Sequence, residues 1–145
     1  MTGTHRDTAC TPLRLAGYAA LFGIRDGGGD TIRKGAFART LRERATGRLG
    51  PLPLFWQHRP GCRIGWVEHA GEDARGLQVI ARIDQPASRA AAALHRRTIC
   101  GLSFGYRVCR HWPVPRGRLL EDLELFEISL VTHPMQHGAR VHLVR

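Results

Sequence analysis

The chain has 145 residues, 43% hydrophobic and 23% charged, a composition that excludes disordered, collagen-like and coiled-coil proteins. Its 21 arginines and one lysine outnumber 12 acidic residues, for a formal net charge of +10, which favours anionic partners such as nucleic acid or acidic protein segments. The length predicts a single domain, and no segment has the roughly 18 consecutive apolar residues of a membrane span. The first seven residues contain no apolar stretch, so we expect neither a signal peptide nor a membrane partner.

The first part of the chain predicts strands around one short helix. Residues 13–22 alternate loosely between apolar and polar and predict a strand. Residues 27–30 predict a turn that lacks the spacing and lysine of a phosphate-binding loop, and residues 31–33 predict a short extended piece. Residues 35–44, apolar at positions 37, 38 and 41, predict an amphipathic helix with its arginines on the outer face.

The rest of the chain predicts further strands and a second helix. Residues 52–58 predict a strand that ends at residues 59–61, and residues 64–70 and 76–83 predict a hairpin. Ser88 predicts the N-cap of a helix over residues 89–97. The last predicted strands are 99–108 and 119–131, separated by a loop at residues 113–117. Many short strands and two helices indicate an α+β fold with a mainly antiparallel sheet or barrel.

The four cysteines are Cys10, Cys62, Cys100 and Cys109, widely spaced and without a C-x-x-C pair. A secreted disulfide scaffold would be denser in cysteine, so we expect reduced thiols in the cytoplasm. Cys100, Cys109 and His111 are conceivable zinc ligands, but their spacing matches no established zinc motif, and we expect no metal.

Ser103 is a candidate nucleophile because Gly101-Leu-Ser-Phe-Gly105 fits the G-x-S-x-G pattern of a nucleophile elbow. An α/β-hydrolase needs about twice this length, which excludes that fold. The glycines still let backbone N–H groups approach a substrate carbonyl, so Gly101, Leu102, Phe104 and Gly105 form a candidate oxyanion region. The alternative is an ordinary serine in a glycine-containing strand or bulge.

A serine hydroxyl needs a base to take its proton, and that base is usually histidine. Among eight histidines, His58 is distinguished by its position at the end of a predicted strand. Alternation places it on the face of Leu52, Leu54 and Trp56, where the ring would be held yet partly open. The alternative is a structural or surface histidine.

Glu127 lies within the apolar run 123–131, where alternation places it on the face of Leu123, Leu125 and Val131. A carboxylate there is costly unless it is hydrogen-bonded, as it is when it orients a histidine. The alternatives are an edge-strand glutamate facing water and a role for His133 as the orienting residue.

Six short segments together resemble the tailed-bacteriophage prohead maturation protease family, which is related in fold to the herpesvirus assembly proteases. Each segment is short, and it is their order and spacing over residues 17–141 that make the resemblance specific. The segments are Gly17-Tyr-Ala-Ala-Leu-Phe, Gly35-Ala-Phe, Leu54-Phe-Trp-Gln-His58, Ile64-Gly, Gly101-Leu-Ser-Phe-Gly-Tyr-Arg107 and Glu127-Ile-Ser-Leu-Val-Thr-x-Pro134.

The resemblance implies one prohead serine protease domain, with a core over residues 12–143 built as a small, mainly antiparallel β-barrel flanked by a few helices. It implies a serine endopeptidase, without a cofactor, that cleaves capsid-protein or scaffold segments inside the assembling procapsid, in the cytoplasm of a bacterial host. His58 falls on the family's catalytic histidine, Ser103 on its nucleophile and Glu127 on the acid before its Ser-Leu-Val-Thr run. After Thr132 the family often continues Pro-Ala-Asn. Here His133 follows instead and stays an alternative third member, as in the His-Ser-His arrangement of the herpesvirus relatives.

The resemblance makes the major capsid protein and scaffold segments the expected partners, and it leaves a homo-oligomer and secondary contact with nucleic acid open. The source could be a phage, a prophage or a gene-transfer agent. Many family members carry a C-terminal scaffold or targeting extension, and with the sequence ending at Arg145 we expect that task to lie elsewhere. Two alternative functions are a basic nucleic-acid-binding module, disfavoured by scattered arginines, and a catalytically inert capsid-assembly protein on the same fold.

Overall fold

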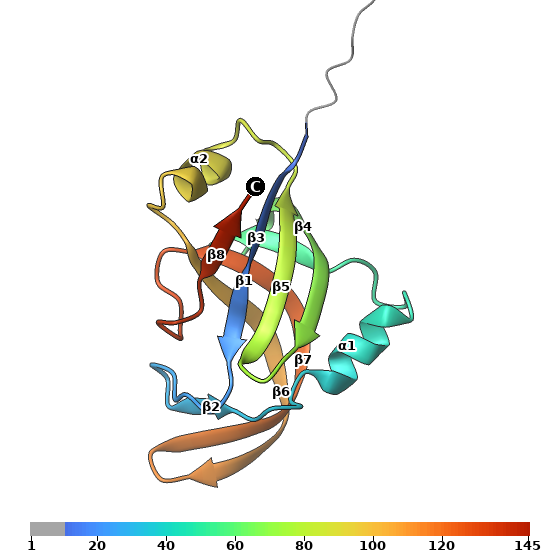
Figure 1. Ribbon diagram of the computed structural model, residues 1–145. Helices are drawn as coiled ribbons and strands as arrows, with labels where there is room; N and C mark the ends of the chain where they lie inside the picture. Colours follow the sequence, from blue (N-terminus) through green and yellow to red (C-terminus); the bar gives the residue numbers. More distant parts are fainter. Residues whose placement is uncertain (1–10) are drawn as a thin grey trace, which may run out of the picture.

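The computed structural model of the protein describes residues 11–145. Cys10 and the first seven residues, on which the expectations about thiols and a signal peptide partly rest, lie outside the described residues. Eight strands and two helices follow one another along the chain (Figure 1). They are β1 (Leu13–Leu21), β2 (Asp30–Ile32), α1 (Ala38–Ala45), β3 (Pro53–Trp56), β4 (Arg59–Glu72), β5 (Gly76–Ile83), α2 (Arg89–His95), β6 (Gly101–Val114), β7 (Gly117–Val131) and β8 (Val141–Val144).

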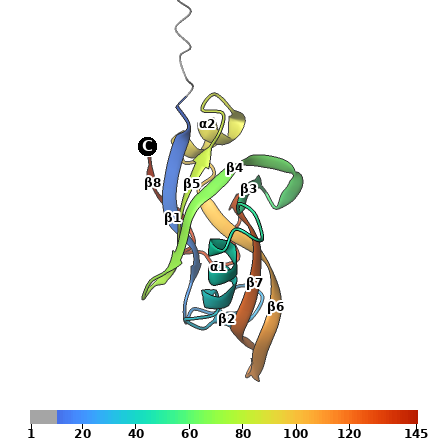
Figure 2. The same ribbon diagram turned by 90° about the vertical axis from the view of Figure 1, so that its right-hand side faces the viewer.

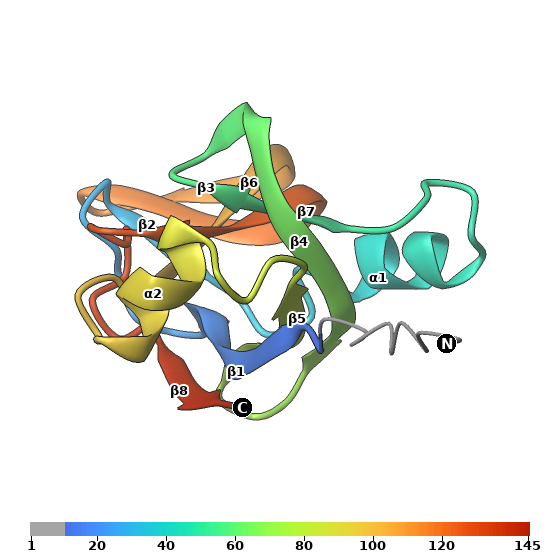
Figure 3. The same ribbon diagram turned by 90° about the horizontal axis from the view of Figure 1, so that it is seen from above.

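The strands form one sheet in the order β2-β7-β3-β4-β5-β1-β8, with β6 paired to β7. The sheet curls around the core, as the view from above shows (Figure 3). It is mainly antiparallel but mixed, because β2 and β3 both pair with β7 in parallel. Between the entry to β8 and β6 there is only an isolated bridge, from Gly101 to Arg140. The expected antiparallel barrel is therefore found only in part, as an open, curled, mixed sheet.

The strand β7 is the organising element of the molecule. One edge pairs with β6 along its length. The other edge is covered in succession by β2, by the α1 segment and by β3. In the middle of these, the Leu123 N–H donates to the Ala36 carbonyl (3.0 Å) and the Leu125 N–H donates to the Thr40 hydroxyl (3.1 Å). Figure 2 shows α1 lying against β7 at this place.

The helix α1 begins three residues later than the sequence predicts. Gly35 has φ +96°, a left-handed conformation outside the helical range, so it cannot be the first helical residue. The N–H groups of Gly35 and Phe37 instead donate to one carboxylate oxygen of Glu72, at 3.2 and 3.0 Å. The segment before α1 is thus tied to the end of β4 rather than wound into a first helical turn.

The helix α2 has the predicted N-cap. The Ser88 side chain accepts a hydrogen bond from the Ala91 N–H (3.2 Å), which satisfies one of the unpaired donors at the helix start. Ala90, Ala91 and Leu94 face the core. Among residues 11–145, no helix is long and apolar enough to cross a membrane.

Three predicted strands are longer than expected, and one was not predicted. The strand β4 includes residues 59–61, which were expected to end the preceding strand. The expected loop at residues 113–117 contracts to Pro115 and Arg116, because β6 and β7 run on to the Val114–Gly117 pair. The short β8 follows the turn after β7 and pairs with β1. At the bottom of Figure 1 the outer end of the β6–β7 hairpin extends past β2.

The hydrophobic core fills the concave side of the curled sheet. Its largest fully buried side chains come from nearly every strand and from the segment before α1, so distant parts of the sequence share one apolar interior. They include Leu15, Ile32, Phe37, Leu54, Leu77, Ile83, Leu94, Leu102, Leu120, Leu123, Leu125 and Ile128.

Candidate active site

His58 lies in the two-residue turn that connects β3 to β4, next to the Trp56–Arg59 pair. Gln57 and His58 have φ +53° and +58°, so both central residues are left-handed, as in the type I′ turns of tight hairpins. Neither residue is glycine, and the left-handed conformation costs an L-residue about 1–2 kcal/mol. The strand ends at Trp56, so His58 lies in the turn beyond it rather than at the predicted last position of the strand, and alternation does not set the direction of its ring.

The His58 ring is hydrogen-bonded to Glu127. Its Nδ1 atom is 2.6 Å from Glu127 Oε1, across 69 residues of sequence. The ring is partly open, with 42% of the side chain exposed, whereas the Glu127 side chain is almost buried. The hydrogen bond to Glu127 favours the protonated ring and raises the pKa of His58 above 6.5, against the opposing effect of its partial burial. A proton on Nδ1 leaves Nε2 as the ring atom that can accept another.

Ser129 closes this pair into a ring of hydrogen bonds. Its hydroxyl donates to the second carboxylate oxygen of Glu127 (2.7 Å) and accepts from the backbone N–H of His58 (3.2 Å). Both carboxylate oxygens of Glu127 are therefore occupied, and the backbone and ring of His58 are tied to the same two side chains. The buried carboxylate has the partners that burial demands.

The predicted face of Glu127 is wrong, because a bulge interrupts the alternation of β7. Gly105 pairs with Glu127 and Tyr106 with Leu125, which leaves Phe126 without an opposite residue in β6. Phe126 is 46% exposed, and the core side of β7 then continues with Ile128 and Leu130. Glu127 consequently lies beside Ser129 and the His58 turn rather than among the core leucines. A one-residue bulge shifts the side-chain pattern in this way.

Ser103 lies on β6 directly opposite Ser129 of β7. Side chains of directly opposite residues share a face of the sheet, with Cβ atoms about 5 Å apart. Ser103 thus belongs to the same face as Ser129 and Glu127, and it is buried. Within the described part of the chain, no hydrogen bond joins the Ser103 hydroxyl to the His58 ring. The structure brings His58 and Glu127 into direct contact and places Ser103 two strand positions from Gly105, the partner of Glu127.

The two glycines around Ser103 have a steric role that the pattern alone did not reveal. A Cβ atom on Gly105 would lie 2.5 Å from Glu127 Oε1, and one on Gly101 would lie 2.7 Å from the Val131 carbonyl oxygen. Gly105 therefore leaves the space that the Glu127 carboxylate fills. Of the candidate oxyanion donors, the Leu102 N–H already donates to the Ala139 carbonyl (2.9 Å). N–H directions alternate along a strand, so those of Gly101 and Gly105 face the paired strand β7 and that of Phe104 points away from it.

The alternative third residue, His133, lies in the exposed segment after β7. The hydrogen-bond partner of the His58 Nδ1 atom in this structure is Glu127 and not His133. Ser129, Gln57 and Thr132 were not predicted as site residues. Ser129 could have been suspected from its place two residues after Glu127, but nothing in the sequence pairs Gln57 with Thr132.

The conceivable zinc ligands are not gathered. Cys100 lies near Arg140 and Cys109 near Arg39. Within residues 11–145, no group of three histidine, cysteine, aspartate or glutamate side chains could hold a metal ion.

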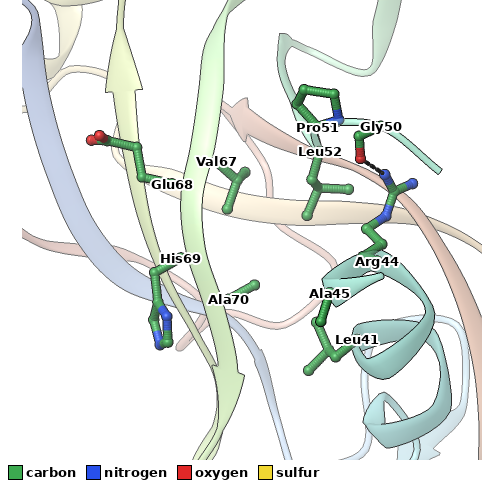
Figure 4. A pocket seen from close by; sticks show the side chains of 10 residues that line it. All are labelled: Leu41, Arg44, Ala45, Gly50, Pro51, Leu52, Val67, Glu68, His69 and Ala70. Atoms are coloured by element: carbon green, nitrogen blue, oxygen red, sulfur yellow. Dashed lines mark hydrogen bonds between the residues drawn. The ribbon is translucent and has the colours of Figure 1, made fainter. Parts of the chain in front are cut away.

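A pocket of about 290 Å³ lies between α1 and β4 (Figure 4). Arg44 lines it and donates to the Gly50 carbonyl (3.1 Å) on one side and to the Leu125 carbonyl (3.0 Å) on the other. Its neighbours are mainly apolar, with Leu41, Leu52 and Val67 among them. None of Ser103, His58 and Glu127 takes part in this pocket.

Two sequence relatives contain regions similar to this chain. The prohead protease of Enterobacteria phage HK97 is 30% identical over 132 residues, which is 86% of this chain and 57% of that protein. The chain thus spans little more than half the length of this relative. The capsid scaffolding protein of Equine herpesvirus 1 (strain Ab4p) is 35% identical over 75 residues, 52% of this chain and 11% of that protein.

Two solved structures share the fold. The bacteriophage T4 capsid assembly protease gp21 matches with a TM-score of 0.63 and 12% identity, over 83% of each chain. The varicella-zoster virus protease matches with a TM-score of 0.60 and 19% identity, over 91% of this chain and 64% of that one. The family model described as caudovirus prohead serine protease matches residues 4–145, nearly the whole sequence. Fold, sequence similarity and family model agree, and the chain belongs to the caudovirus prohead serine protease family.

Proposed function

We propose that this chain is a serine endopeptidase of phage capsid maturation, with Ser103 as nucleophile, His58 as general base and then acid, and Glu127 as the residue that orients His58. The observation that carries the proposal is the 2.6 Å contact between His58 Nδ1 and Glu127 Oε1, on a sheet face that also includes Ser103. A nucleophile, a base and a carboxylate that holds the base are the parts that peptide hydrolysis by serine requires.

The first chemical step is attack of the Ser103 hydroxyl oxygen on the scissile carbonyl. Because Glu127 holds the proton on Nδ1, His58 accepts the serine proton at Nε2 and then donates it to the leaving amine. The acyl-enzyme bond to Ser103 is broken by a water molecule, whose proton passes through His58 in the same way. Ser103 and His58 are not hydrogen-bonded in the resting structure, and such contacts often tighten only when substrate is bound.

The negative charge that develops on the carbonyl oxygen needs hydrogen-bond donors. The candidate among these residues is the Phe104 N–H, which by alternation points away from β7, as the Leu102 N–H does. One preorganised donor of this kind is worth about 3 kcal/mol in the transition state.

The substrates we propose are segments of the major capsid protein or of a scaffold, cleaved inside the assembling procapsid in the host cytoplasm. Support comes from the names of the relatives, a phage prohead protease and a capsid assembly protease. The net charge of +10 is compatible with acidic substrate segments. That net figure already subtracts the acidic side chains, and within residues 11–145 eight arginines form ion pairs with them. These are Arg14, Arg33, Arg39, Arg63, Arg82, Arg107, Arg110 and Arg118.

The test is capsid-protein processing in cells that express the chain together with the capsid protein of its own phage. Ser103→Ala and His58→Ala should each abolish processing. The matched controls are Ser88→Ala, which removes only the α2 N-cap at a cost of about 1 kcal/mol, and His95→Ala at the exposed end of that helix. Processing at the wild-type rate by either active-site variant would overturn the assignment. Labelling of the wild-type chain by a fluorophosphonate, lost in Ser103→Ala, separates an active protease from an inert assembly protein.

A further inference from the structure

Gln57, the neighbour of His58, uses its whole side-chain amide on Thr132, the residue that follows β7. Its Oε1 atom accepts from the Thr132 N–H (3.1 Å), and its Nε2 donates to the Thr132 hydroxyl (2.6 Å). Its backbone N–H donates to the Leu130 carbonyl (3.0 Å). Three hydrogen bonds therefore attach this single turn residue to the end of the strand that carries Glu127 and Ser129.

These hydrogen bonds stabilise a turn whose backbone conformation is unfavourable by itself. Gln57 and His58 are both left-handed, a backbone conformation that costs residues other than glycine about 1–2 kcal/mol each. The sequence supplies neither Asn-Gly nor Asp-Gly, the pairs that favour such a turn. The hydrogen bonds to Thr132, Leu130 and Ser129 take the place of that local preference.

The His58 ring depends on the turn for its orientation. With 42% of its side chain exposed, the ring has one side-chain hydrogen bond, to Glu127. Its position relative to Glu127 is consequently decided by the backbone of residues 57 and 58. A shift of about 1 Å at a catalytic group can lower a rate by about 100-fold.

We infer that Gln57 is a positioning residue: its paired hydrogen bonds to Thr132 hold the left-handed turn in the one arrangement that aligns His58 with Glu127. The inference rests on the proposed role of His58 as general base. Among the described residues, the hydrogen bonds of Gln57 go to Thr132 and Leu130 and not to Ser103 or the His58 ring, so Gln57 acts through the backbone.

Replacing Gln57 with glycine distinguishes an effect on the position of His58 from an effect on the stability of the turn. Gln57→Gly removes the amide but relieves the left-handed cost, so the variant should unfold at a temperature close to that of the wild type. Gln57→Leu removes the amide and keeps the cost, so it should be less stable. Both should lose about 10- to 100-fold in the rate at which a fluorophosphonate modifies Ser103. Thr132→Val, which removes only the hydroxyl acceptor, should show a smaller loss.

The pH dependence of labelling gives a second readout. In the wild type the acidic limb reports His58, whose pKa is raised by Glu127. Misalignment weakens that bond, so the limb should move to lower pH in Gln57→Gly and Gln57→Leu. Gln78→Leu on β5, an exposed glutamine away from the site, should change neither rate nor limb.

The outcomes are distinct. In one outcome Gln57→Gly is labelled at the wild-type rate, with the wild-type acidic limb in its pH profile, while labelling of the wild type still depends on Ser103 and His58. That result would overturn the positioning role of Gln57 and leave the proposed function standing. A labelling rate in Ser103→Ala or His58→Ala equal to that of the wild type would overturn the proposed function and the inference with it.

Discussion

The turn at Gln57–His58 and the turn at Pro115–Arg116 each connect two neighbouring strands across two residues, and each holds a residue other than glycine in the left-handed region. They differ in their surroundings. The first is bonded through backbone and side chains to Leu130, Thr132 and Ser129. The second, at the outer end of the β6–β7 hairpin, is exposed, and Arg116 with φ +67° occupies a position where a type II turn prefers glycine.

The comparison separates two uses of the same backbone conformation. In the outer turn the left-handed residue only reverses the chain. In the inner turn it directs a histidine toward a buried carboxylate, and the neighbouring polar groups hold it there. Substitutions in the inner region should therefore change activity, whereas equivalent changes in the outer region should change stability alone.

The largest expected effect comes from Glu127→Gln. The amide keeps the shape of the carboxylate but lacks its charge and can present an N–H where Oε1 now faces His58 Nδ1. The wrong tautomer of His58 should lower kcat by about 10³- to 10⁴-fold, the scale found when the aspartate of a serine-protease triad becomes an amide. Steady-state hydrolysis of a peptide from the cleavage site measures it.

The matched control for that variant lies on the same strand. Glu124→Gln breaks the ion pair with the exposed Arg107, at 2.5 Å and midway along the hairpin, and should leave kcat unchanged. Equal losses in the two variants would contradict the distinction between inner and outer regions.

The next largest effect should come from Gly105→Ala. The added methyl would lie 2.5 Å from Glu127 Oε1, so carboxylate or strand must move. We expect a loss of about 10- to 100-fold in kcat and about 1–3 kcal/mol in the free energy of unfolding. Gly61→Ala in β4, where the new atom has no neighbour within 4 Å, is the control. An active and stable Gly105→Ala protein would show that the carboxylate does not need its present position.

The titration of His58 should change the activity and the stability of the protein in opposite directions as the pH rises. Glu127 raises the pKa of His58 above 6.5, so activity should fall as pH drops through that raised value and the ring becomes charged. For stability the sign is reversed. A raised folded-state pKa contributes stability that is fully present below 6.5 and is lost as pH rises through the folded-state value. Denaturant unfolding of the wild type and His58→Ala at pH 5.5 and 8.5 tests it, and an identical pH response of the two proteins would refute it.

The smallest effect should come from Arg116→Gly in the outer turn. Relief of the left-handed cost, partly offset by greater freedom of the unfolded chain, should stabilise the protein by about 0.5–1 kcal/mol. The melting temperature should rise by about 2–4 °C, with kcat unchanged. A drop in activity would show that the outer turn also takes part in function.

Sequence patterns correctly predicted the elements whose structure depends on residues close together in the chain. The alternation of β1 and β5 and the N-cap of α2 at Ser88 were all found as expected. The ends of β4 and β6 were misjudged because Pro60 and Pro113 lie inside strands. Proline is tolerated there because β6 pairs only with β7 and because the β3–β4 register is irregular near residue 60.

The sequence indicated which types of residue form the candidate site, but it did not indicate how their side chains are arranged. A carboxylate in an apolar run indicated that Glu127 needs partners, and it has them. Its face was misplaced because the bulge at Phe126 cannot be read from a pattern that alternates equally well without it. The Gln57–Thr132 contact joins residues 75 positions apart, through a parallel β3–β7 pairing that no local motif encodes.

The same parallel pairing has a consequence for the order in which the protein assembles. Ser103 and Glu127 belong to one hairpin, whose contacts are comparatively close in sequence. His58 joins them only when β3 docks on β7, a contact between residues about 70 positions apart, and such distant contacts carry a larger entropic cost and form later. A chain that has formed only the hairpin therefore holds the proposed nucleophile and acid without the base. On the proposed mechanism, proteolytic activity therefore requires the completed sheet, and a partly folded copy is inactive.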